Sequence, residues 1–558
     1  MQQHFDVEMR LNVNVPMRDG VNLSADIYLP QASGPFPTVL IRTPYSNNTD
    51  DSIKQGRRLA NEGYACVIQD VRGRWDSEGD YYPFIYEADD GYDTQEWVGR
   101  QPFCNGRIGM SGGSYLGCVQ WLSAPLRSEF LTCLAPRVMC NDYFKDLLYS
   151  GGAFQLNVAI TWGMRTRART AQSIDFHNWT EAFRTLPLSE MATHVGEDVP
   201  FWKDWIEHAT DDEYWDAINV ERKFHEIAVP ALEMGGWYDL YSSKSFTNWS
   251  GLRDRGSTPE TKQGKLIVGP WPHRLSQCTC TGDVDFGTHS MVDLDALELR
   301  WFDYWLKGID NGILDEPPIR LFIMGINEWR DEHEWPLART DWQEWHFHSG
   351  GHANTVVGDG VLSPDVPADE PTDHFTYDPR FPVQTLGGNN CCSPEHVPWG
   401  PHDQRAVEMR GDVLCYTSPP LERDTEITGP IQVILHASSD ATDTDWTAKL
   451  VDVSPSGYAM NLCDGIQRAR YRESRVDPAL IEPGKVYEYT IDVGVTGSVF
   501  RKGHQVRVEI SSSNFPRFDR NPNTGHAIGQ DAIMQPARQT IHHSHEYPSR
   551  ILLPVIPS

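Results

Sequence analysis

Three side chains that cooperate in nucleophilic hydrolysis each follow a short apolar segment of this sequence. The three segments end in Gly112-Gly113-Ser114-Tyr115-Leu116-Gly117, Gly236-Trp237-Tyr238-Asp239 and Gly269-Pro270-Trp271-Pro272-His273. A serine hydroxyl attacks a carbonyl when a histidine removes its proton, and a carboxylate orients that histidine. The order serine, acid, histidine is typical of folds in which the serine occupies a sharp turn between a strand and a helix. The sequence therefore predicts a triad of Ser114, Asp239 and His273.

Two serines compete for the nucleophile position. Ser111 fits the pattern Gly-x-Ser-x-Gly literally, whereas Ser114 fits a looser Gly-x-Ser-x-x-Gly. A turn at Ser111 would begin the following helix with Gly112 and Gly113, each of which costs about 1 kcal/mol relative to alanine. A turn at Ser114 gives the preceding strand its full length and starts the helix at Tyr115. This difference favours Ser114.

The negative oxygen that forms during such an attack needs hydrogen-bond donors. The backbone N–H of Tyr115, directly after the nucleophile, is one candidate. Tyr45 follows an early apolar segment, at the position where the second donor normally arises, and its phenol O–H can serve in that role. Tyr115 is therefore the expected donor, with Tyr45 as a candidate for the second, although a tyrosine after proline in a loop is more often a packing residue.

Other residue groups are candidate metal ligands. They are Cys278 with Cys280, the aspartates Asp440, Asp443 and Asp445, and the histidines His542, His543 and His545. A histidine committed to the triad cannot complete the cysteine pair, and the aspartates lack the central glycine and final glutamate of a calcium loop. We expect no catalytic metal and no cofactor, and leave open a structural cation near Asp440–Asp445. Asp70 and Arg72 are expected to form a buried structural ion pair near Ser114.

The elements that must position these residues form an α/β unit. Leu11–Leu29 alternates apolar and polar residues around a turn at Asp19-Gly20, which predicts an antiparallel hairpin. Short apolar runs alternating with helical stretches then predict a parallel sheet covered on both faces, with sites at the carboxyl ends of its strands. The runs are Thr38–Arg42, Ala65–Gln69, Arg107–Met110, Val229–Met234 and Lys265–Val268.

Two further segments differ from this pattern. Residues 146–225 are rich in tryptophan and phenylalanine at helical spacing, which predicts a helical cap inserted in the sheet domain, and Met291–Lys307 predicts an amphipathic helix. After Leu337 short strands and turns predict a jelly-roll β-sandwich. We therefore predict an α/β-hydrolase domain in two parts, 1–145 and 226–340, a cap at 146–225 and a β-sandwich at 341–558. Some tryptophans of the cap, and Trp237, are expected to face the substrate.

Composition excludes several other functions. The 558 residues contain 48 Lys+Arg and 78 Asp+Glu, so the formal charge is −30, which argues against nucleic acid and anionic membranes as partners. The sequence shows neither a membrane-spanning run nor a secretory signal. An odd, scattered set of 11 Cys argues against a disulfide framework. We expect a cytoplasmic protein.

With these motifs in place, the chain resembles the cocaine esterase and X-prolyl dipeptidyl-peptidase group of α/β-hydrolases, which includes α-amino-acid ester hydrolases and cephalosporin acylases. The resemblance covers nearly the whole chain. Besides the serine and histidine motifs, it includes Arg42-Thr43-Pro44-Tyr45, Asp70-Val71-Arg72-Gly73-Arg74 and Ser439-Asp440-Ala441-Thr442-Asp443-Thr444-Asp445-Trp446. It implies the triad and oxyanion roles given above, and it implies that Trp162 and Tyr241 line the acyl pocket.

The resemblance implies a serine hydrolase that cleaves carboxylic esters, with amides as a further possibility. Leu240-Tyr241-Ser242-Ser243 after the acid contains no carboxylate to bind a substrate ammonium group, so an apolar or aromatic acyl group is favoured. An amino-acid-directed hydrolase (an aminopeptidase or β-lactam acylase) and a catalytically inactive binding protein remain the alternatives. A homo-oligomer is compatible with the sequence.

Overall fold

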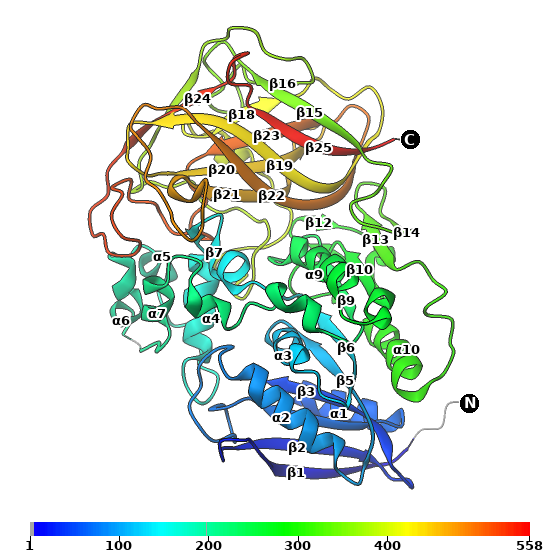
Figure 1. Cartoon of the computed structure of the whole chain (residues 1–558). Helices are drawn as coiled ribbons and strands as arrows, with labels where there is room; N and C mark the ends of the chain where they lie inside the picture. Colours follow the sequence, from blue (N-terminus) through cyan, green and yellow to red (C-terminus); the bar gives the residue numbers. More distant parts are fainter. Residues whose placement is uncertain (1–4, 197, 558) are drawn as a thin grey trace.

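A ten-stranded mixed sheet forms the lower part of the molecule in this computed structural model, which describes residues 5–196 and 198–557 (Figure 1). Its strands follow the order β1-β2-β4-β3-β5-β6-β9-β10-β13-β14. They span Val7–Pro16 (β1), Asn22–Pro30 (β2), Phe36–Thr43 (β3), Ala65–Asp70 (β4), Cys104–Gly113 (β5), Leu131–Arg137 (β6), Leu232–Gly236 (β9), Lys265–Gly269 (β10), Ile319–Ile323 (β13) and Glu328–Glu332 (β14). From β4 to β13 neighbouring strands pair in parallel, whereas β1, β2 and β14 pair antiparallel at the two edges.

The predicted N-terminal hairpin is confirmed by strands β1 and β2. The backbone N–H of Met17 donates to the carbonyl of Val21 at 2.8 Å and closes the turn. Gly20 has a φ of 89°, a left-handed conformation that glycine adopts without steric cost. The hairpin pairs with β4 and so extends one edge of the parallel sheet.

Helices cover both faces of the sheet. On β5, Ile108 and Met110 join the core cluster that contains residues of α2 and α3, while Gly109 between them faces Phe302 of α10. Because side chains alternate along a strand, these helices lie on opposite faces. The helices are α1 (Asp50–Asn61), α2 (Glu87–Gly99), α3 (Tyr115–Ser123), α9 (Ser242–Arg255) and α10 (Leu294–Lys307). The predicted helix over 291–307 is thus α10, which begins three residues later because the Asp293 side chain caps it.

The segment 146–225 is predominantly helical and lies between the sheet and the upper domain (Figure 1). Its strands and helices are β7 (Tyr149–Ser150), β8 (Ala153–Phe154), α4 (Leu156–Thr166), α5 (Trp179–Ala182), α6 (Met191–His194), α7 (Trp202–Glu207) and α8 (Glu213–Asp216). Four of its tryptophans are buried, namely Trp179, Trp202, Trp205 and Trp215. Trp162 on α4 remains partly exposed. The aromatic residues of the cap therefore mainly form its own core.

The C-terminal part is an eleven-stranded sheet whose strand pairs are antiparallel except for β16 with β18. The strands are β15 (Asp341–His348), β16 (Val361–Ser363), β17 (Asp373–Tyr377), β18 (Leu414–Thr417), β19 (Thr425–Ser439), β20 (Asp445–Val453), β21 (Ala459–Arg468), β22 (Tyr487–Phe500), β23 (Gln505–Ser511), β24 (Ala537–His542) and β25 (Arg550–Ile556), with a short helix α11 (Arg405–Glu408). We call this part the β domain. The predicted fold class, an α/β-hydrolase sheet with a C-terminal β domain, is confirmed, whereas the predicted boundaries of the cap and of the other domains stay predictions.

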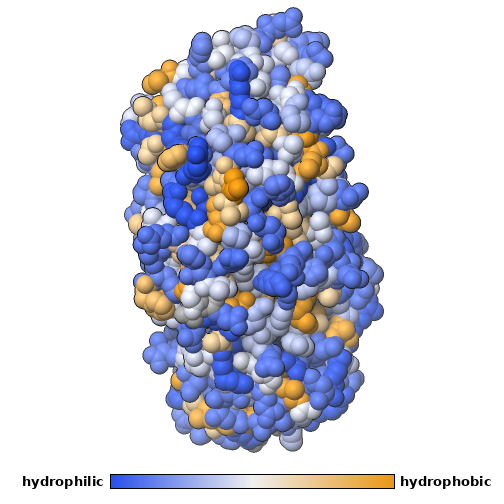
Figure 2. Space-filling model, turned by 90° about the vertical axis from the view of Figure 1, so that its left-hand side faces the viewer, coloured by the Kyte–Doolittle hydropathy of each residue, from blue (hydrophilic) through white to orange (hydrophobic). Residues whose placement is uncertain are grey.

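The surface agrees with the acidic composition. Figure 2 shows a mostly hydrophilic face on which apolar residues form small, separated groups. Among the described residues, no helix has both the length and the apolar character needed to cross a membrane.

Candidate active site

Ser114 occupies the turn between the end of β5 at Gly113 and the start of α3 at Tyr115. Its backbone has φ 58° and ψ −127°, a strained conformation for a residue with a side chain. Gly112 allows this sharp turn, because a Cβ there would lie 2.4 Å from the Cβ of Leu116. The chain therefore places a serine hydroxyl at the N-terminus of a helix, as the glycine pattern predicted.

His273 connects this serine to the acid. Its Nε2 lies 3.0 Å from Ser114 Oγ, and its Nδ1 lies 2.6 Å from Asp239 Oδ2. Asp239 follows the end of β9 and His273 follows the end of β10, two neighbouring parallel strands. The other carboxylate oxygen of Asp239 accepts the backbone N–H of Tyr241 at 2.9 Å. The arrangement can move a proton from a serine hydroxyl to an oriented imidazole.

The competing serine, Ser111, lies elsewhere. Its hydroxyl donates to Glu298 Oε1 on α10 at 2.6 Å, and its side chain is buried. Within the described chain, the hydrogen bond from the serine turn to His273 is made by Ser114. Ser111 therefore joins the strand to a helix on the far side of the sheet.

Tyr45 lies beside the serine turn and beside the cap. Its hydroxyl oxygen accepts the indole N–H of Trp162 at 3.0 Å, and the nearby Ser114 hydroxyl acts to lower its pKa. Burial raises the pKa of Tyr45, although the hydrogen bonds with Trp162 and Ser114 oppose the shift, so the phenol keeps its proton at neutral pH. Tyr115 supplies the first backbone N–H of α3, a group that a helix cannot satisfy internally. Both predicted oxyanion donors thus lie next to the serine.

A buried polar group supports the turn from below. The Tyr115 hydroxyl donates to Glu87 Oε1 at 2.7 Å, and Arg42 Nη1 lies 2.6 Å from Glu87 Oε2. Burial raises the pKa of Glu87 and the positive charge of Arg42 opposes that shift. The side chain of Tyr115 is therefore fixed, and with it the start of α3.

Aromatic rings pack near the serine turn and near His273. The ring of Trp162 stacks on that of Phe84 with a centroid distance of 5.8 Å and on that of Tyr115 at 6.0 Å. The ring of Tyr241 lies 6.1 Å from the imidazole of His273. Of the two residues predicted to line the acyl pocket, Trp162 thus lies beside Tyr45 and Tyr115, and Tyr241 lies beside His273.

With this geometry established, comparisons with known proteins give a consistent result. Residues 19–274 match the family model described as "X-Pro dipeptidyl-peptidase (S15 family)", and residues 311–552 match "X-Pro dipeptidyl-peptidase C-terminal non-catalytic domain". The chain is 38% identical over 577 residues to cocaine esterase of Rhodococcus sp. (strain MB1 Bresler), with 98% of each chain covered. The chain belongs to the X-Pro dipeptidyl-peptidase (S15) family.

Solved structures extend the similarity of this S15 chain to the whole fold. An aminopeptidase from a marine sediment archaeon, Thaumarchaeota archaeon, superposes with a TM-score of 0.86 at 27% identity, covering 99% of this chain and 97% of the other. An α-amino acid ester hydrolase superposes with a TM-score of 0.83 at 26% identity, covering 100% and 97%. The chain is a serine hydrolase of the S15 and cocaine esterase family.

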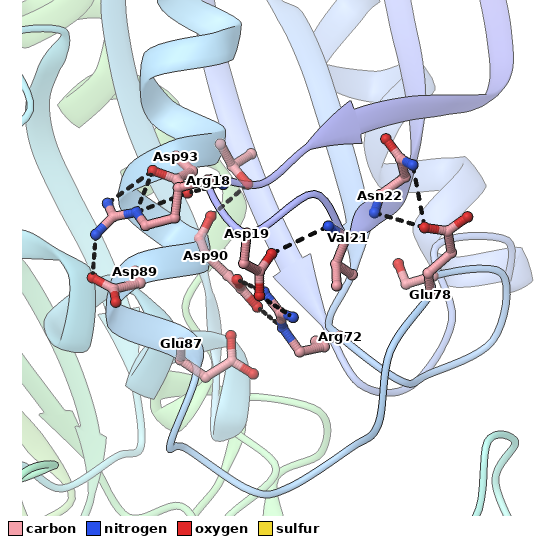
Figure 3. A network of polar contacts seen from close by, with 12 residues as sticks. Arg18, Asp19, Val21, Asn22, Arg72, Glu78, Glu87, Asp89, Asp90 and Asp93 are labelled. Atoms are coloured by element: carbon pink, nitrogen blue, oxygen red, sulfur yellow. Dashed lines mark hydrogen bonds and ion pairs between the residues drawn. The ribbon is translucent and has the colours of Figure 1, made fainter.

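One predicted contact of the S15 chain is wrong. Arg72 does not pair with Asp70. Its guanidinium instead makes two hydrogen bonds to Asp90 on α2, at 2.9 and 2.6 Å, and one to Asp19 in the β1–β2 turn at 2.8 Å (Figure 3). Asp70 accepts the backbone N–H of Asn47 at 2.7 Å. The fold thus places the carboxylates of Asp90 and Asp19 within hydrogen-bonding distance of the Arg72 guanidinium, and the carboxylate of Asp70 bonds elsewhere.

Trp237 corrects a second expectation. It is fully buried rather than facing a substrate, because its indole N–H donates to the carbonyl of Phe322 at 2.7 Å and its ring packs on Gly497 of the β domain. The turn that carries Asp239 is therefore enclosed by the β domain.

The other candidate ligand groups have partners within the protein. Asp443 pairs with Arg470 and Asp445 with Arg468, at 2.7 and 2.8 Å. His543 is buried with its Nε2 2.9 Å from Asp373. Across the described ranges, no three His, Cys, Asp or Glu residues are arranged to hold a metal ion. One disulfide joins the adjacent residues Cys391 and Cys392.

Sequence reasoning missed two aromatic residues and one amide of this site. Phe84 has a φ of 70° and its ring lies 4.3 Å from that of Tyr143, so both rings belong to the buried aromatic group near Trp162. The run Tyr81-Tyr82-Pro83-Phe84 was the available signal for Phe84. Asn389 of the β domain contacts the turn of Asp239, and no local pattern marks it.

Proposed function

We propose that the chain hydrolyses carboxylic esters that carry an apolar or aromatic acyl group, through a covalent acyl-enzyme on Ser114. The observation that carries the proposal is the position of His273, whose two ring nitrogens lie 3.0 Å from Ser114 and 2.6 Å from Asp239. Similarity to cocaine esterase over the whole chain supports an ester as the substrate.

In the proposed reaction Ser114 Oγ forms a bond to the acyl carbon while His273 Nε2 takes the hydroxyl proton. Asp239 holds Nδ1–H and stabilises the imidazolium. The imidazolium then gives its proton to the departing alcohol oxygen, and the ester C–O bond breaks. Water, deprotonated by the same imidazole, attacks the acyl carbon, and the imidazolium gives that proton to Ser114 Oγ as the acyl–serine bond breaks, which releases the acid and the free serine.

The negative oxygen of each intermediate would be held by two donors. The Tyr45 oxygen already accepts the N–H of Trp162, so its own hydroxyl proton is available to point at the substrate. The N–H of Tyr115 is the second donor, and the N-terminus of α3 adds a favourable electrostatic field.

The preference for an apolar or aromatic acyl group is supported by the rings around the serine. Trp162 remains partly exposed while its ring stacks on the buried rings of Phe84 and Tyr115, and an aromatic ring binds planar apolar groups with little loss of conformational freedom. Tyr241 closes the side next to His273.

A panel of acyl esters and matched amides tests the proposal with purified protein. Ser114→Ala is expected to lower kcat by about 10³-fold or more, because the nucleophile is lost. Ser111→Ala is the matched control: it removes the hydrogen bond to Glu298 and is expected to lower stability by about 1–2 kcal/mol while leaving kcat unchanged. Activity that persists in the first variant and disappears in the second would contradict the assignment.

A second candidate is a hydrolase directed at α-amino acyl groups. It is supported by the similarity to the archaeal aminopeptidase and to the α-amino acid ester hydrolase. A phenylacetyl ester and its α-amino analogue, compared by kcat/KM, separate the two candidates. Labelling of Ser114 by a fluorophosphonate separates both from an inactive binding protein, which would not react.

A further inference from the structure

Asn389 of the β domain contacts the turn that carries the acid of the triad, although it lies 150 residues beyond Asp239 in the chain. Its side-chain Nδ2 donates to the carbonyl oxygens of Trp237 at 2.8 Å and Asp239 at 2.9 Å, and lies 3.1 Å from Ser242 Oγ. The side chain is only 5% exposed. One buried amide thus spans the turn from its first residue to the start of α9.

Among the described residues, the carbonyl of Trp237 accepts only this amide, whereas that of Asp239 also accepts the backbone N–H of Ser242 at 3.0 Å. Beyond Gly236 the chain leaves the sheet, so the carbonyls of Trp237 and Asp239 no longer face a neighbouring strand. A buried carbonyl without a donor costs about 1–3 kcal/mol. Since an amide nitrogen carries two hydrogens and its oxygen carries none, the nitrogen must face the two carbonyls.

On the side of Leu240 and Ser242 the turn is only partly packed by side chains. A cavity of about 240 Å³ lies there, and its lining includes Leu240, Ser242, Lys244, Asn389, Asp464 and Arg517. The Oδ1 atom of Asn389 is buried and has no hydrogen-bond partner in the described part of the chain. Hydrogen bonds from Asn389 therefore add to the packing of Trp237 against the β domain in holding the turn.

The loop that carries Asn389 is itself held in place. Gly388 and Gly400 exchange two backbone hydrogen bonds, at 2.7 and 2.9 Å, which close the base of the loop. The neighbouring Asn390 donates through Nδ2 to the carbonyls of Gly387 at 2.9 Å and Pro398 at 3.0 Å. Asn389 is consequently presented to the turn by a loop that is already fixed.

We infer that Asn389 is a positioning residue for the catalytic acid, and that the β domain thereby takes part in aligning the triad. The inference rests on the proposed function of Asp239. Fixing the carbonyls at both ends of Trp237–Asp239 fixes the direction in which the carboxylate leaves the backbone. That direction determines the 2.6 Å contact between Asp239 and His273. A family domain described as non-catalytic then supplies a residue on which the reaction depends.

Asn389→Ala tests the inference in the full-length chain. Loss of the two hydrogen bonds is expected to lower kcat by about 10- to 100-fold, because a small displacement of a catalytic group has effects of this size. KM should change by less than about twofold, since Asn389 does not touch the substrate. The acid limb of the pH profile of kcat/KM should move to lower pH, because a misdirected carboxylate stabilises the protonated base less well.

Two further variants make the result specific. Asn389→Asp keeps the shape of the side chain but places a carboxylate against two carbonyls, and is expected to be at least as impaired as Asn389→Ala. Asn390→Ala is the matched control, because it removes two loop hydrogen bonds of similar length and leaves the acid turn untouched. It should lower thermal stability without moving the acid limb of the profile.

The outcomes separate this inference from the proposed function. If the wild-type chain fails to hydrolyse esters and to react with a fluorophosphonate, the proposed function is wrong. If the wild type is active and Asn389→Ala retains its kcat and pH profile, the role of Asn389 is wrong. The role of Asn389 would also be wrong if Asn389→Ala and Asn390→Ala lost equal kcat in proportion to their loss of folded protein. The loss of activity would then come from a less stable loop and not from a misplaced acid.

Discussion

At the residue scale, the contact between Trp162 and Tyr45 links the cap to the proposed oxyanion site. The indole N–H occupies one lone pair of the phenol oxygen, at 3.0 Å, and this limits the directions in which the phenol proton can point. A tryptophan selected to bind an acyl group would need only its ring. The hydrogen bond gives Trp162 a second task, the orientation of Tyr45.

Tyr45→Phe and Trp162→Phe together measure this task. Removing the Tyr45 hydroxyl is expected to lower kcat by about 10²- to 10³-fold with little change in KM, because an oxyanion donor acts mainly in the transition state. Trp162→Phe keeps an aromatic ring against Phe84 but loses the N–H, so we expect a smaller loss of about tenfold. Steady-state kinetics on one aromatic ester check both values. A Trp162→Phe variant that raises KM and leaves kcat intact would show that only the ring matters.

At the element scale, the junction of β5 and α3 depends on glycines that let the strand and helix approach closely. Gly112 combines a φ of +133° with a neighbour that a Cβ would strike, the Cβ of Leu116 at 2.4 Å. Gly106, at the other end of β5, also has a positive φ, +86°, but has nothing within 4 Å. A substitution at Gly106 therefore tests the effect of the positive φ alone, whereas one at Gly112 tests the positive φ together with the close contact to Leu116.

Gly112→Ala is expected to displace α3 and so to lower both stability and activity. We expect the free energy of unfolding to fall by about 1–3 kcal/mol, as for an overpacked site, with a parallel fall in kcat. Gly106→Ala should cost about 1 kcal/mol from its φ alone and leave kcat unchanged. Urea unfolding and ester kinetics on the two variants give the comparison. Equal kcat values for both would contradict a role of the close contact in placing Ser114.

The elements were predictable from sequence wherever a local pattern specifies them. The β1–β2 hairpin follows from alternation and an Asp-Gly turn, and α10 from apolar spacing closed by Gly308, whose φ is 71°. The order of Ser114, Asp239 and His273 after apolar runs was sufficient to predict residues that the fold then brings into contact. Their catalytic roles remain predictions that the variants above test.

Contacts between distant segments were not predictable in this way. Arg72 had a carboxylate two positions away, yet it pairs with Asp90 and Asp19 because helix packing and a turn bring them closer. Asn389 reaches the acid turn across a domain boundary, and nothing in the composition of its loop indicates which surface it meets. A sequence read alone specifies periodicity and turn chemistry, whereas the choice of a long-range partner depends on how the elements pack.

At the scale of the whole molecule, a buried carboxylate makes stability depend on pH. Burial raises the pKa of Asp70 from 3.8 to about 7, and the hydrogen bond from the Asn47 backbone opposes only part of that shift. The folded state therefore retains a proton that the unfolded chain releases near pH 4. Between pH 4 and 7 the unfolded state binds fewer protons, so the contribution of Asp70 to stability falls as pH rises.

Asp70→Asn removes this dependence and keeps an acceptor for the Asn47 N–H. The variant is expected to gain stability relative to the wild type as pH rises from about 4 to 7, with no further gain above about pH 8. The measurement is the difference in free energy of unfolding in urea at several pH values, which cancels the titrating groups common to both proteins. A difference that is constant across this range would contradict a raised pKa at Asp70.

The enclosure of the acid turn by the β domain has a consequence for synthesis. A ribosome releases Ser114, Asp239 and His273 well before it releases Asn389 and Gly497, the residues that meet this turn from the β domain. A nascent chain thus holds the whole triad in its sequence while the turn of Asp239 still lacks its support. We expect hydrolytic activity to arise late in translation, once the C-terminal half has emerged and closed around Trp237.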